Sequence, residues 1–206
     1  MFICFEGIDG AGKSTHLNYF MNKLKEQNLQ TISTREPGGT PTGEQLRVLL
    51  IHYDLSVESQ IMLAFAARQM HVQQVIIPAL AQNKYVISDR YLDSTYAYQG
   101  YGKDGDLDLI NNLHILTCQN LYPDYTILLD IEPSVAQSRR EKREGKSLDN
   151  FEKKSIDFYI KVRNGYLETA IKHQKQGHKY FIIDADDTIY NIQKQLDSII
   201  TAILKN

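Results

Sequence analysis

The chain has 206 residues, of which 42% are hydrophobic and 23% charged, and its formal net charge is -2 at pH 7. This composition is ordinary for a globular protein and provides no broad basic face, which argues against a nucleic acid polymer as a partner. No stretch approaches the ~18 apolar residues of a membrane span. Because Glu6 also interrupts the first apolar run, we expect no signal peptide, no membrane partner and a cytoplasmic location.

The first predicted elements are a strand at 2–6 and a helix at 13–27, and a full G-x-x-x-x-G-K-[ST] motif connects them. Glycines let such a loop curl its backbone N–H groups around phosphate oxygens, and the start of the following helix favours the same anion. The motif predicts a nucleoside triphosphate site with Lys13 on the β- and γ-phosphates and Ser14 on magnesium; a chance match is the alternative. The predicted nucleotide-binding residues are Gly7, Ile8, Asp9, Gly10, Ala11, Gly12, Lys13, Ser14 and Thr15.

Short β-rich runs alternate with longer helical ones along the rest of the chain. The other predicted strands are 31–35, 85–89, 126–130 and 180–184. The other predicted helices are 42–50, 57–82, 107–121, 134–143, 148–176 and 189–204. This alternation predicts an α/β fold with a parallel sheet covered on both faces, and the absence of a linker or repeat predicts one domain over 1–206. Several predicted strands end in charged residues, at the edge where open α/β sheets bind ligands.

Three charged clusters extend the predicted site. Arg35 at a strand end and Arg47 on the next helix suit a second phosphate, although both can be solvated surface residues. Asp89 can hold a magnesium shell and Arg90 can neutralise a transferring phosphoryl group, or the two can form a local salt bridge. The basic run 139–146 forms either a mobile flap or a solvated face.

The cysteines and histidines predict no further chemistry. Cys4 and Cys118 lack a C-x-x-C spacing or a metal-ligand partner, which is typical of reduced, buried thiols. The six histidines lack metal-ligand spacing, so no structural metal is predicted.

Four segments together resemble the thymidylate kinase family, and the likeness covers nearly the whole chain. They are Phe5-Glu6-Gly7-Ile8-Asp9-Gly10, Arg35-Glu36-Pro37-Gly38-Gly39-Thr40, Asp89-Arg90-Tyr91 and Ala97-Tyr98-Gln99-Gly100-Tyr101-Gly102. The resemblance implies a P-loop kinase fold with a five-stranded parallel sheet. It also implies a homodimer that uses ATP and Mg²⁺ to phosphorylate dTMP to dTDP in dTTP biosynthesis. The predicted helix 57–82 is apolar on more than one face, which fits a dimer contact or core packing alone.

The lid resembles that of the bacterial subtype, in which an arginine of the lid replaces one in the phosphate loop. Gly10 occupies the loop position where the other subtype has arginine. The lid, at about 139–148, offers Arg139, Arg140 and Arg143, of which we select Arg143.

The resemblance also assigns roles within the site. The implied catalytic residues are Lys13, Arg90, Asp9 and Arg143, and the implied magnesium residues are Ser14 and Asp89. The implied acceptor-site residues are Arg35, Arg47, Phe65, Arg68, Thr95, Tyr98 and Gln99. Among these, Arg35 and Arg47 would bind the monophosphate and Arg68 the pyrimidine O4. Tyr98 either crowds a ribose 2′-hydroxyl, which favours deoxy substrates, or packs its helix.

Position 64 departs from the family pattern. The family has a phenylalanine four residues before the base-binding arginine, where it stacks on thymine, whereas this chain has Ala64 there and Phe65 next to it. One step along a helix turns a side chain by roughly 100°. The helix is therefore locally adjusted, another aromatic fills the gap, or the pocket is looser. A kinase for another nucleoside or nucleoside monophosphate, or a nucleotide-dependent switch, are the alternative functions.

Overall fold

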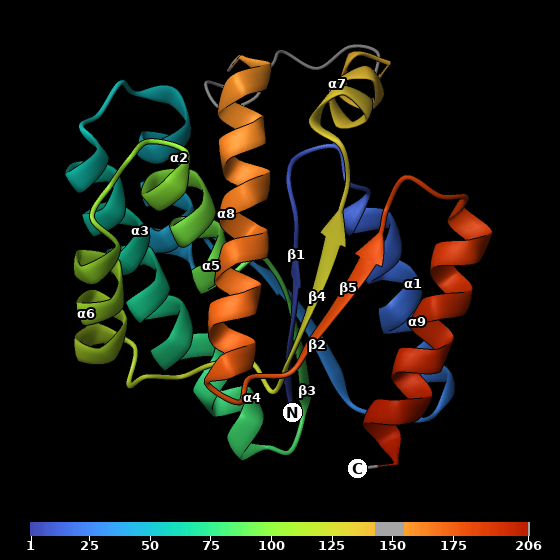
Figure 1. Cartoon of the computed structure of the whole chain (residues 1–206). Helices are drawn as coiled ribbons and strands as arrows, with labels where there is room; N and C mark the ends of the chain where they lie inside the picture. The colour runs from blue at the N-terminus through green and yellow to red at the C-terminus, as the bar shows by residue number, and fades with distance from the viewer. Residues whose placement is uncertain (143–154, 206) are drawn as a thin grey trace.

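The computed structural model describes residues 1–142 and 155–205, and its centre is a five-stranded parallel sheet (Figure 1). The strands are β1 (Phe2–Glu6), β2 (Thr31–Arg35), β3 (Tyr85–Asp89), β4 (Tyr125–Asp130) and β5 (Tyr180–Asp184). They lie in the order β2-β3-β1-β4-β5. Helices cover both faces of the sheet, which confirms the predicted α/β fold class.

The helices follow the predicted order with two differences. The α-helices are α1 (Lys13–Glu26), α2 (Pro41–His52), α3 (Val57–His71), α4 (Ile77–Ala81), α5 (Leu92–Thr95), α6 (Leu107–Thr117), α7 (Pro133–Glu141), α8 (Ile156–Lys175) and α9 (Ile189–Leu204). The π-helix η1 (Val72–Ile76) lies between α3 and α4, so the predicted helix 57–82 is divided. The segment α5 to η2 (Tyr96–Tyr101) was not predicted. The start of the predicted helix 148–176 lies outside the described residues. None of the helices in the described ranges is long and apolar enough to cross a membrane.

Local sequence explains where several helices begin. Thr40, Ser56 and Thr188 each accept a hydrogen bond from a backbone N–H three residues further along, at the starts of α2, α3 and α9. These caps satisfy backbone donors that a helix leaves without a partner.

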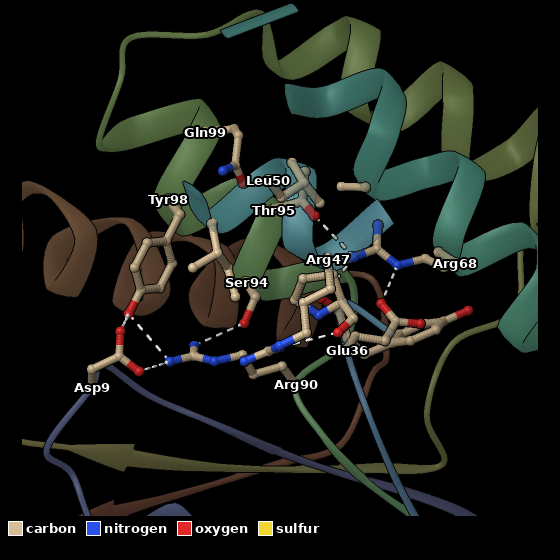
Figure 2. Close-up of a pocket in the computed structure, with 14 residues that line it drawn as sticks. Asp9, Glu36, Arg47, Leu50, Arg68, Arg90, Ser94, Thr95, Tyr98 and Gln99 are labelled. Atoms are coloured by element: carbon tan, nitrogen blue, oxygen red, sulfur yellow. Dashed lines mark hydrogen bonds and ion pairs between the residues drawn. The ribbon is translucent and has the colours of Figure 1, made fainter. Parts of the chain in front are cut away.

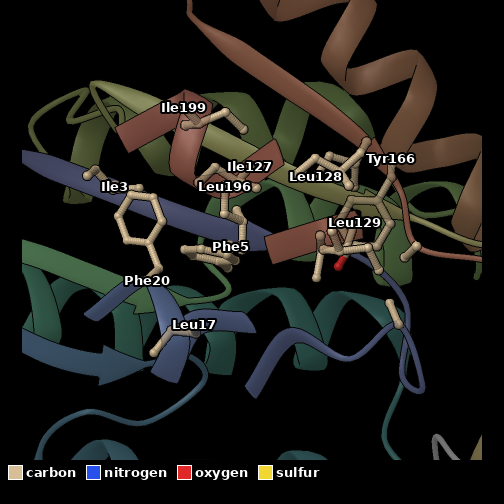
Figure 3. Packing of buried hydrophobic residues seen from close by; sticks show 14 of the residues in the cluster. Ile3, Phe5, Leu17, Phe20, Ile127, Leu128, Leu129, Tyr166, Leu196 and Ile199 are labelled. Carbon is tan, nitrogen blue, oxygen red and sulfur yellow. The ribbon is translucent and has the colours of Figure 1, made fainter. Parts of the chain in front are cut away.

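Alternate side chains of β1 fill two cores. Ile3 and Phe5 pack with residues of α1 and α9 on one face (Figure 3), whereas Phe2 and Cys4 belong to the cluster that includes α3 on the other. Both faces are buried because β1 is the central strand. Cys118 is also buried, and both cysteines are free thiols, as predicted.

The register of the sheet brings the predicted site segments together. Phe5 of β1 pairs with Asp89 of β3, which also pairs with Arg35 of β2. The backbone N–H of Arg90 donates to the Phe5 carbonyl at 2.9 Å. The phosphate loop and the two charged strand ends therefore meet at the carboxyl edge of the sheet, where parallel α/β folds bind ligands.

Because His114 is buried, the free energy of unfolding should depend on pH. It is fully buried between the Tyr91 and Tyr122 rings, and neither ring nitrogen has a hydrogen-bond partner among the described residues. Burial and then the charge of Arg68 lower the pKa of His114 to about 3. An unfolded histidine has a pKa of about 6.5, so below that pH the unfolded chain binds a proton that the native chain does not. Above pH 6.5 His114 is neutral in both states and does not lower the free energy of unfolding. As the pH falls from 6.5 towards 3, protonation of His114 in the unfolded chain lowers the free energy of unfolding progressively.

We therefore expect the free energy of unfolding to fall by ~2 kcal/mol from this group alone between pH 7.5 and pH 5. Urea unfolding at both pH values measures the loss. In His114→Phe, which keeps an aromatic ring at this place, that part of the pH dependence should disappear. The same pH dependence in the variant would assign the acid sensitivity to other groups.

Candidate active site

The phosphate loop follows β1 and ends where α1 begins. Gly10 has φ 96°, and a Cβ there would lie 2.5 Å from the backbone carbonyl oxygen of Ala136 on α7. Gly12, immediately before α1, has φ 88°. Both positions need glycine, because L side chains rarely adopt such backbone angles. The loop consequently packs closely against α7 and directs the N-terminus of α1 towards the site.

Lys13 lies over this loop and is almost completely buried. Its Nζ donates to the carbonyl oxygens of Gly7 at 3.0 Å and Ile8 at 3.1 Å, and lies 4.0 Å from Asp9 Oδ1. Burial first and Arg90 second lower the pKa of Lys13, while Asp9 opposes the shift. The ammonium group is thus held where phosphate oxygens can replace the loop carbonyls as its partners.

Asp9 and Arg90 form the closest ion pair of the site (Figure 2). Arg90 Nη2 donates to Asp9 Oδ1 at 2.5 Å, and the hydroxyl of Tyr98 donates to Asp9 Oδ2 at 2.8 Å. Burial alone would raise the pKa of Asp9, but the charges of Arg90 and Lys13 hold it well below its usual range. Asp9 is therefore an anionic carboxylate at neutral pH.

Most of the predicted acceptor-site residues line one cavity beside the phosphate loop (Figure 2). The predicted residues that line it are Asp9, Arg47, Arg68, Arg90, Thr95, Tyr98 and Gln99. Glu36, Pro37, Leu50, Ile51, Ala64, Tyr91 and Ser94 complete the lining. The cavity therefore combines three guanidinium groups with an apolar wall, which suits an anionic ligand that also carries an aromatic base.

Arg68 is held rigidly inside this cavity. Its Nε donates to Glu36 Oε2 at 2.7 Å, and its Nη2 donates to Thr95 Oγ1 at 2.9 Å. The other carboxylate oxygen of Glu36 contacts His71 Nδ1 at 2.9 Å, and His71 Nε2 contacts Thr34 Oγ1 at 2.6 Å. In contrast, Arg68 Nη1 is buried with no hydrogen-bond partner in the described part of the chain. A fixed donor without a partner is suited to a carbonyl oxygen of a bound base.

Phe65 and Ala64 point in different directions from α3. Ala64 lines the cavity, whereas Phe65 is 2% exposed and belongs to the cluster on one face of the sheet. The Arg68 guanidinium lies 4.7 Å from the centroid of the Phe65 ring and 5.2 Å from that of Tyr91. The structure therefore places Phe65 behind Arg68, the arginine predicted to bind the base, rather than on the cavity wall.

Arg35 lies apart from the other predicted acceptor-site residues. It is exposed, forms a two-pronged ion pair with Glu44 at 2.7 and 3.2 Å, and lines a second cavity. Ser14 and Asp89 line the same second cavity. Asp89 Oδ1 is buried and has no hydrogen-bond partner among residues 1–142 and 155–205. A carboxylate oxygen in this state, in a cavity that a serine also lines, fits the oxygen ligands that Mg²⁺ prefers.

The lid arginines of the described ranges have different partners. Arg140 Nη1 donates to the backbone carbonyl of Asp9 at 2.7 Å, and its guanidinium lies 4.1 Å from the centroid of the Tyr159 ring. Arg139 donates to the Ala185 carbonyl at 2.9 Å. Arg143 lies outside the described residues. Arg140 is thus the lid arginine that the structure places against the phosphate loop.

Comparison with known proteins now gives the family. The family described as Thymidylate kinase matches residues 5–196. The chain belongs to the thymidylate kinase family. It is 42% identical to the thymidylate kinase of Janthinobacterium sp. over 202 residues, which cover 98% of this chain and 97% of that protein. It is 39% identical to the thymidylate kinase of Paraburkholderia phytofirmans over 206 residues, which cover 98% of each. The thymidylate kinase of Thiobacillus denitrificans is 40% identical over 95% of this chain and 93% of its own length.

In this thymidylate kinase family member, several residues of the site were missing from the sequence prediction. Ser94 and Tyr166 both contact Arg90, and Glu36 holds Arg68. Glu36 lies within a recognised segment and Ser94 lies close to one, so both could have been selected from the sequence. Tyr166 is on α8, 76 residues from Arg90, and no local pattern marks it.

Proposed function

We propose that this kinase transfers the γ-phosphoryl group of ATP to dTMP, giving dTDP for dTTP synthesis. The observation that carries the proposal is the position of Arg90. Its guanidinium donates to the Gly7 carbonyl of the phosphate loop at 3.0 Å and also lines the acceptor cavity. One cationic group therefore serves both the donor phosphates and the acceptor.

The chemistry needs positioning and charge neutralisation rather than a general base. The nucleophile is a phosphate oxygen of the acceptor, which is largely ionised near neutral pH. Lys13 and the loop N–H groups hold the donor phosphates, and Arg90 draws the two substrates together. Asp9 faces the sugar 3′-hydroxyl and keeps Arg90 in place through their ion pair. Arg47, which lines the cavity, binds the acceptor phosphate, and Arg35 approaches it from the second cavity.

Ser14 and Asp89 would hold magnesium, directly or through water. When bound, the ion neutralises negative charge on the phosphates. The buried Asp89 Oδ1 without a partner supports this assignment.

The thymine base lies along the apolar wall near Ala64, with its O4 accepting from Arg68 Nη1. Thr95 and Gln99 face the base and sugar from the same side. Tyr98 is fixed through Asp9, so its ring crowds a ribose 2′-hydroxyl and favours deoxy acceptors. Phe65 contributes by supporting the Arg68 guanidinium. The lid completes the site, with Arg143 closing over the γ-phosphoryl and Arg140 supporting the loop.

The proposal includes a single catalytic domain, a cytoplasmic location and a homodimer that forms through α2, α3 and α6. The two free, buried thiols fit a reducing compartment. In the predicted helix 57–82, whose apolar faces suggested a dimer contact, Ile61, Phe65, Val72 and Ile76 are core residues. The large exposed apolar side chains on α2, α3 and α6 are instead Val48, Leu49, Met62, Ile115 and Leu116. These lie on helices that occupy the same side of the molecule (Figure 1).

Leu116 is 79% exposed, so an aspartate there should not disturb the fold. Leu116→Asp is expected to convert the dimer to a monomer, because it would place a charge in an apolar contact. Light scattering after size-exclusion chromatography measures the mass. The matched control is Tyr190→Asp, which changes an apolar side chain that is 73% exposed on α9, at the opposite side. A wild-type monomer, or a dimer that persists in the Leu116 variant, would refute this interface.

The catalytic proposal is tested by ADP release from ATP and Mg²⁺ with dTMP, with thymidine or without an acceptor. We expect rapid release that depends on dTMP. Slow release that ignores dTMP would instead indicate a nucleotide-dependent switch.

A further inference from the structure

Two hydroxyl groups hold the Arg90 guanidinium, one from Ser94, which also lines the acceptor cavity, and one from Tyr166. Arg90 Nη1 donates to the hydroxyl oxygen of Tyr166 at 2.7 Å and to Ser94 Oγ at 3.1 Å. Ser94 belongs to α5 and Tyr166 to α8, so two elements distant in sequence meet at one nitrogen atom. Tyr166 is 2% exposed and lines neither of the two cavities of the site.

A buried carboxylate lies behind this pair. Ser94 Oγ donates to Glu6 Oε2 at 2.6 Å. Glu6 Oε1 accepts from the backbone N–H groups of Tyr91 at 2.7 Å and Ser94 at 3.3 Å. Glu6, the last residue of β1, is 1% exposed and also lines neither cavity. The central strand is thereby connected to the turn that carries Arg90.

When Glu6 is ionised, these contacts fix the direction of the Ser94 and Tyr166 hydroxyl hydrogens. An ionised carboxylate only accepts, so Ser94 gives its single hydrogen to Glu6. The lone pairs of Ser94 are then left for Arg90 and for the Tyr166 hydroxyl, which is 2.8 Å away. Because the single Ser94 hydrogen is already used, Tyr166 is the donor in this contact. The lone pairs of the Tyr166 oxygen then also face Arg90. Both hydroxyl oxygens therefore present only acceptors to the guanidinium, as a cation requires.

We propose that Glu6, Ser94 and Tyr166 form a positioning unit that fixes the Arg90 guanidinium for phosphoryl transfer. This inference rests on the proposed function, because it assigns a role to groups behind the arginine that serves both substrates. Glu6 and Tyr166 act through Arg90 rather than on the substrates. Catalysis depends on such groups because a small displacement of a charged side chain lowers the rate strongly.

The ionisation of Glu6 should make the effect of this unit on kcat depend on pH. Burial first and Asp93 second raise the pKa of Glu6 to about 7, while Arg90 and the Ser94 and Tyr91 hydrogen bonds oppose the shift. The titratable or charged groups that act on Glu6 or respond to it are Cys4, Lys13, Arg90, Asp93, Tyr166 and Tyr180. A protonated Glu6 would donate to Ser94 and turn the serine hydrogen towards the cation. Glu6→Gln imitates that state at every pH.

The experiment is steady-state kinetics of the 206-residue enzyme with ATP, Mg²⁺ and dTMP at pH 8. We expect Tyr166→Phe and Glu6→Gln each to lower kcat by about 10-fold to 100-fold. The KM for ATP should change by less than about threefold, because ground-state binding of the donor is retained. Ser94→Ala should show the same loss of kcat, and Ser94→Thr, which keeps the hydroxyl, should restore most of it.

The matched control is Tyr180→Phe. Tyr180 has a partly buried hydroxyl, which donates to Asp93 at 2.7 Å, and within the described ranges it forms no hydrogen bond with Arg90. Urea unfolding of all variants separates stability from catalysis. We expect Tyr180→Phe to keep its kcat even if its stability falls as much as that of Tyr166→Phe.

The second measurement is the pH dependence of kcat. The ratio of wild-type kcat to that of Glu6→Gln cancels the ionisation of dTMP, and we expect it to be larger at pH 8.5 than at pH 6. An active wild type, with kcat unchanged in folded Tyr166→Phe and Ser94→Ala, would overturn the inference. A wild type without dTMP-dependent activity would instead refute the proposed function.

Discussion

Replacing Lys13 by methionine is expected to lower kcat by about 10³-fold, which corresponds to ~4 kcal/mol of transition-state stabilisation. Lys13 Nζ is buried over the phosphate loop, where it contacts two loop carbonyls and, at 4.0 Å, the Asp9 carboxylate. In a buried site a positive charge stabilises the transferring phosphoryl group more strongly than it would in water. Methionine keeps the length and flexibility of the side chain and removes the charge.

Lys23→Met is the control for this change. Lys23 lies on the same helix, is exposed and pairs with Glu26, so its loss should leave kcat unchanged. Initial rates of ADP release at saturating dTMP measure both variants, and calorimetric titration with ADP shows whether nucleotide binding survives. Wild-type turnover in Lys13→Met would refute the assignment of the loop as the site of the transferred phosphate.

Replacing Arg90 by glutamine should be about as severe, with kcat lower by about 10³-fold. Its guanidinium is shared between the Gly7 carbonyl, the Asp9 carboxylate and the acceptor cavity. The change would remove charge neutralisation from both substrates. It would also leave Asp9 with less opposing charge and so raise the pKa of this carboxyl, because the Arg90 charge now holds it low.

Arg90→Lys separates charge from geometry. An ammonium keeps the charge but cannot donate to all the partners that the planar guanidinium reaches. We expect the lysine variant to regain only part of the lost kcat in the same assay. If both variants retained wild-type kcat, Arg90 would not act in the chemical step.

Much of the fold was predictable from local sequence. The observed bounds of β1, β2, β3 and β5 agree with the predicted strands, and β4 begins one residue earlier, at Tyr125. Short apolar runs between polar turns identify buried parallel strands well. The segment 92–101 was missed because its threonine, tyrosine and glycine residues have modest helix propensity. Its helices are stabilised instead by packing against α8, which no local pattern shows.

The site was predictable where its residues are contiguous. The phosphate loop and Asp89-Arg90 could be selected from the sequence because such motifs depend on local backbone geometry, and the register of the sheet brings them together. The direction of Phe65, the ion pair of Arg35 with Glu44 and the contact of Tyr166 with Arg90 depend on how distant elements pack. Resemblance assigned roles to Arg35 and Phe65, but it could not show that both lie away from the acceptor cavity.

The most direct test of the central claim is a comparison of kcat/KM for dTMP, dUMP, UMP, dCMP and AMP at one ATP concentration, with each product identified by mass. We expect dTMP to give the highest value and dTDP to be formed in equal amount to ADP. UMP should be a poor acceptor because Tyr98 opposes its 2′-hydroxyl. Preferred turnover of another monophosphate, or ADP release without dTDP, would contradict the assignment of this cavity to thymidylate.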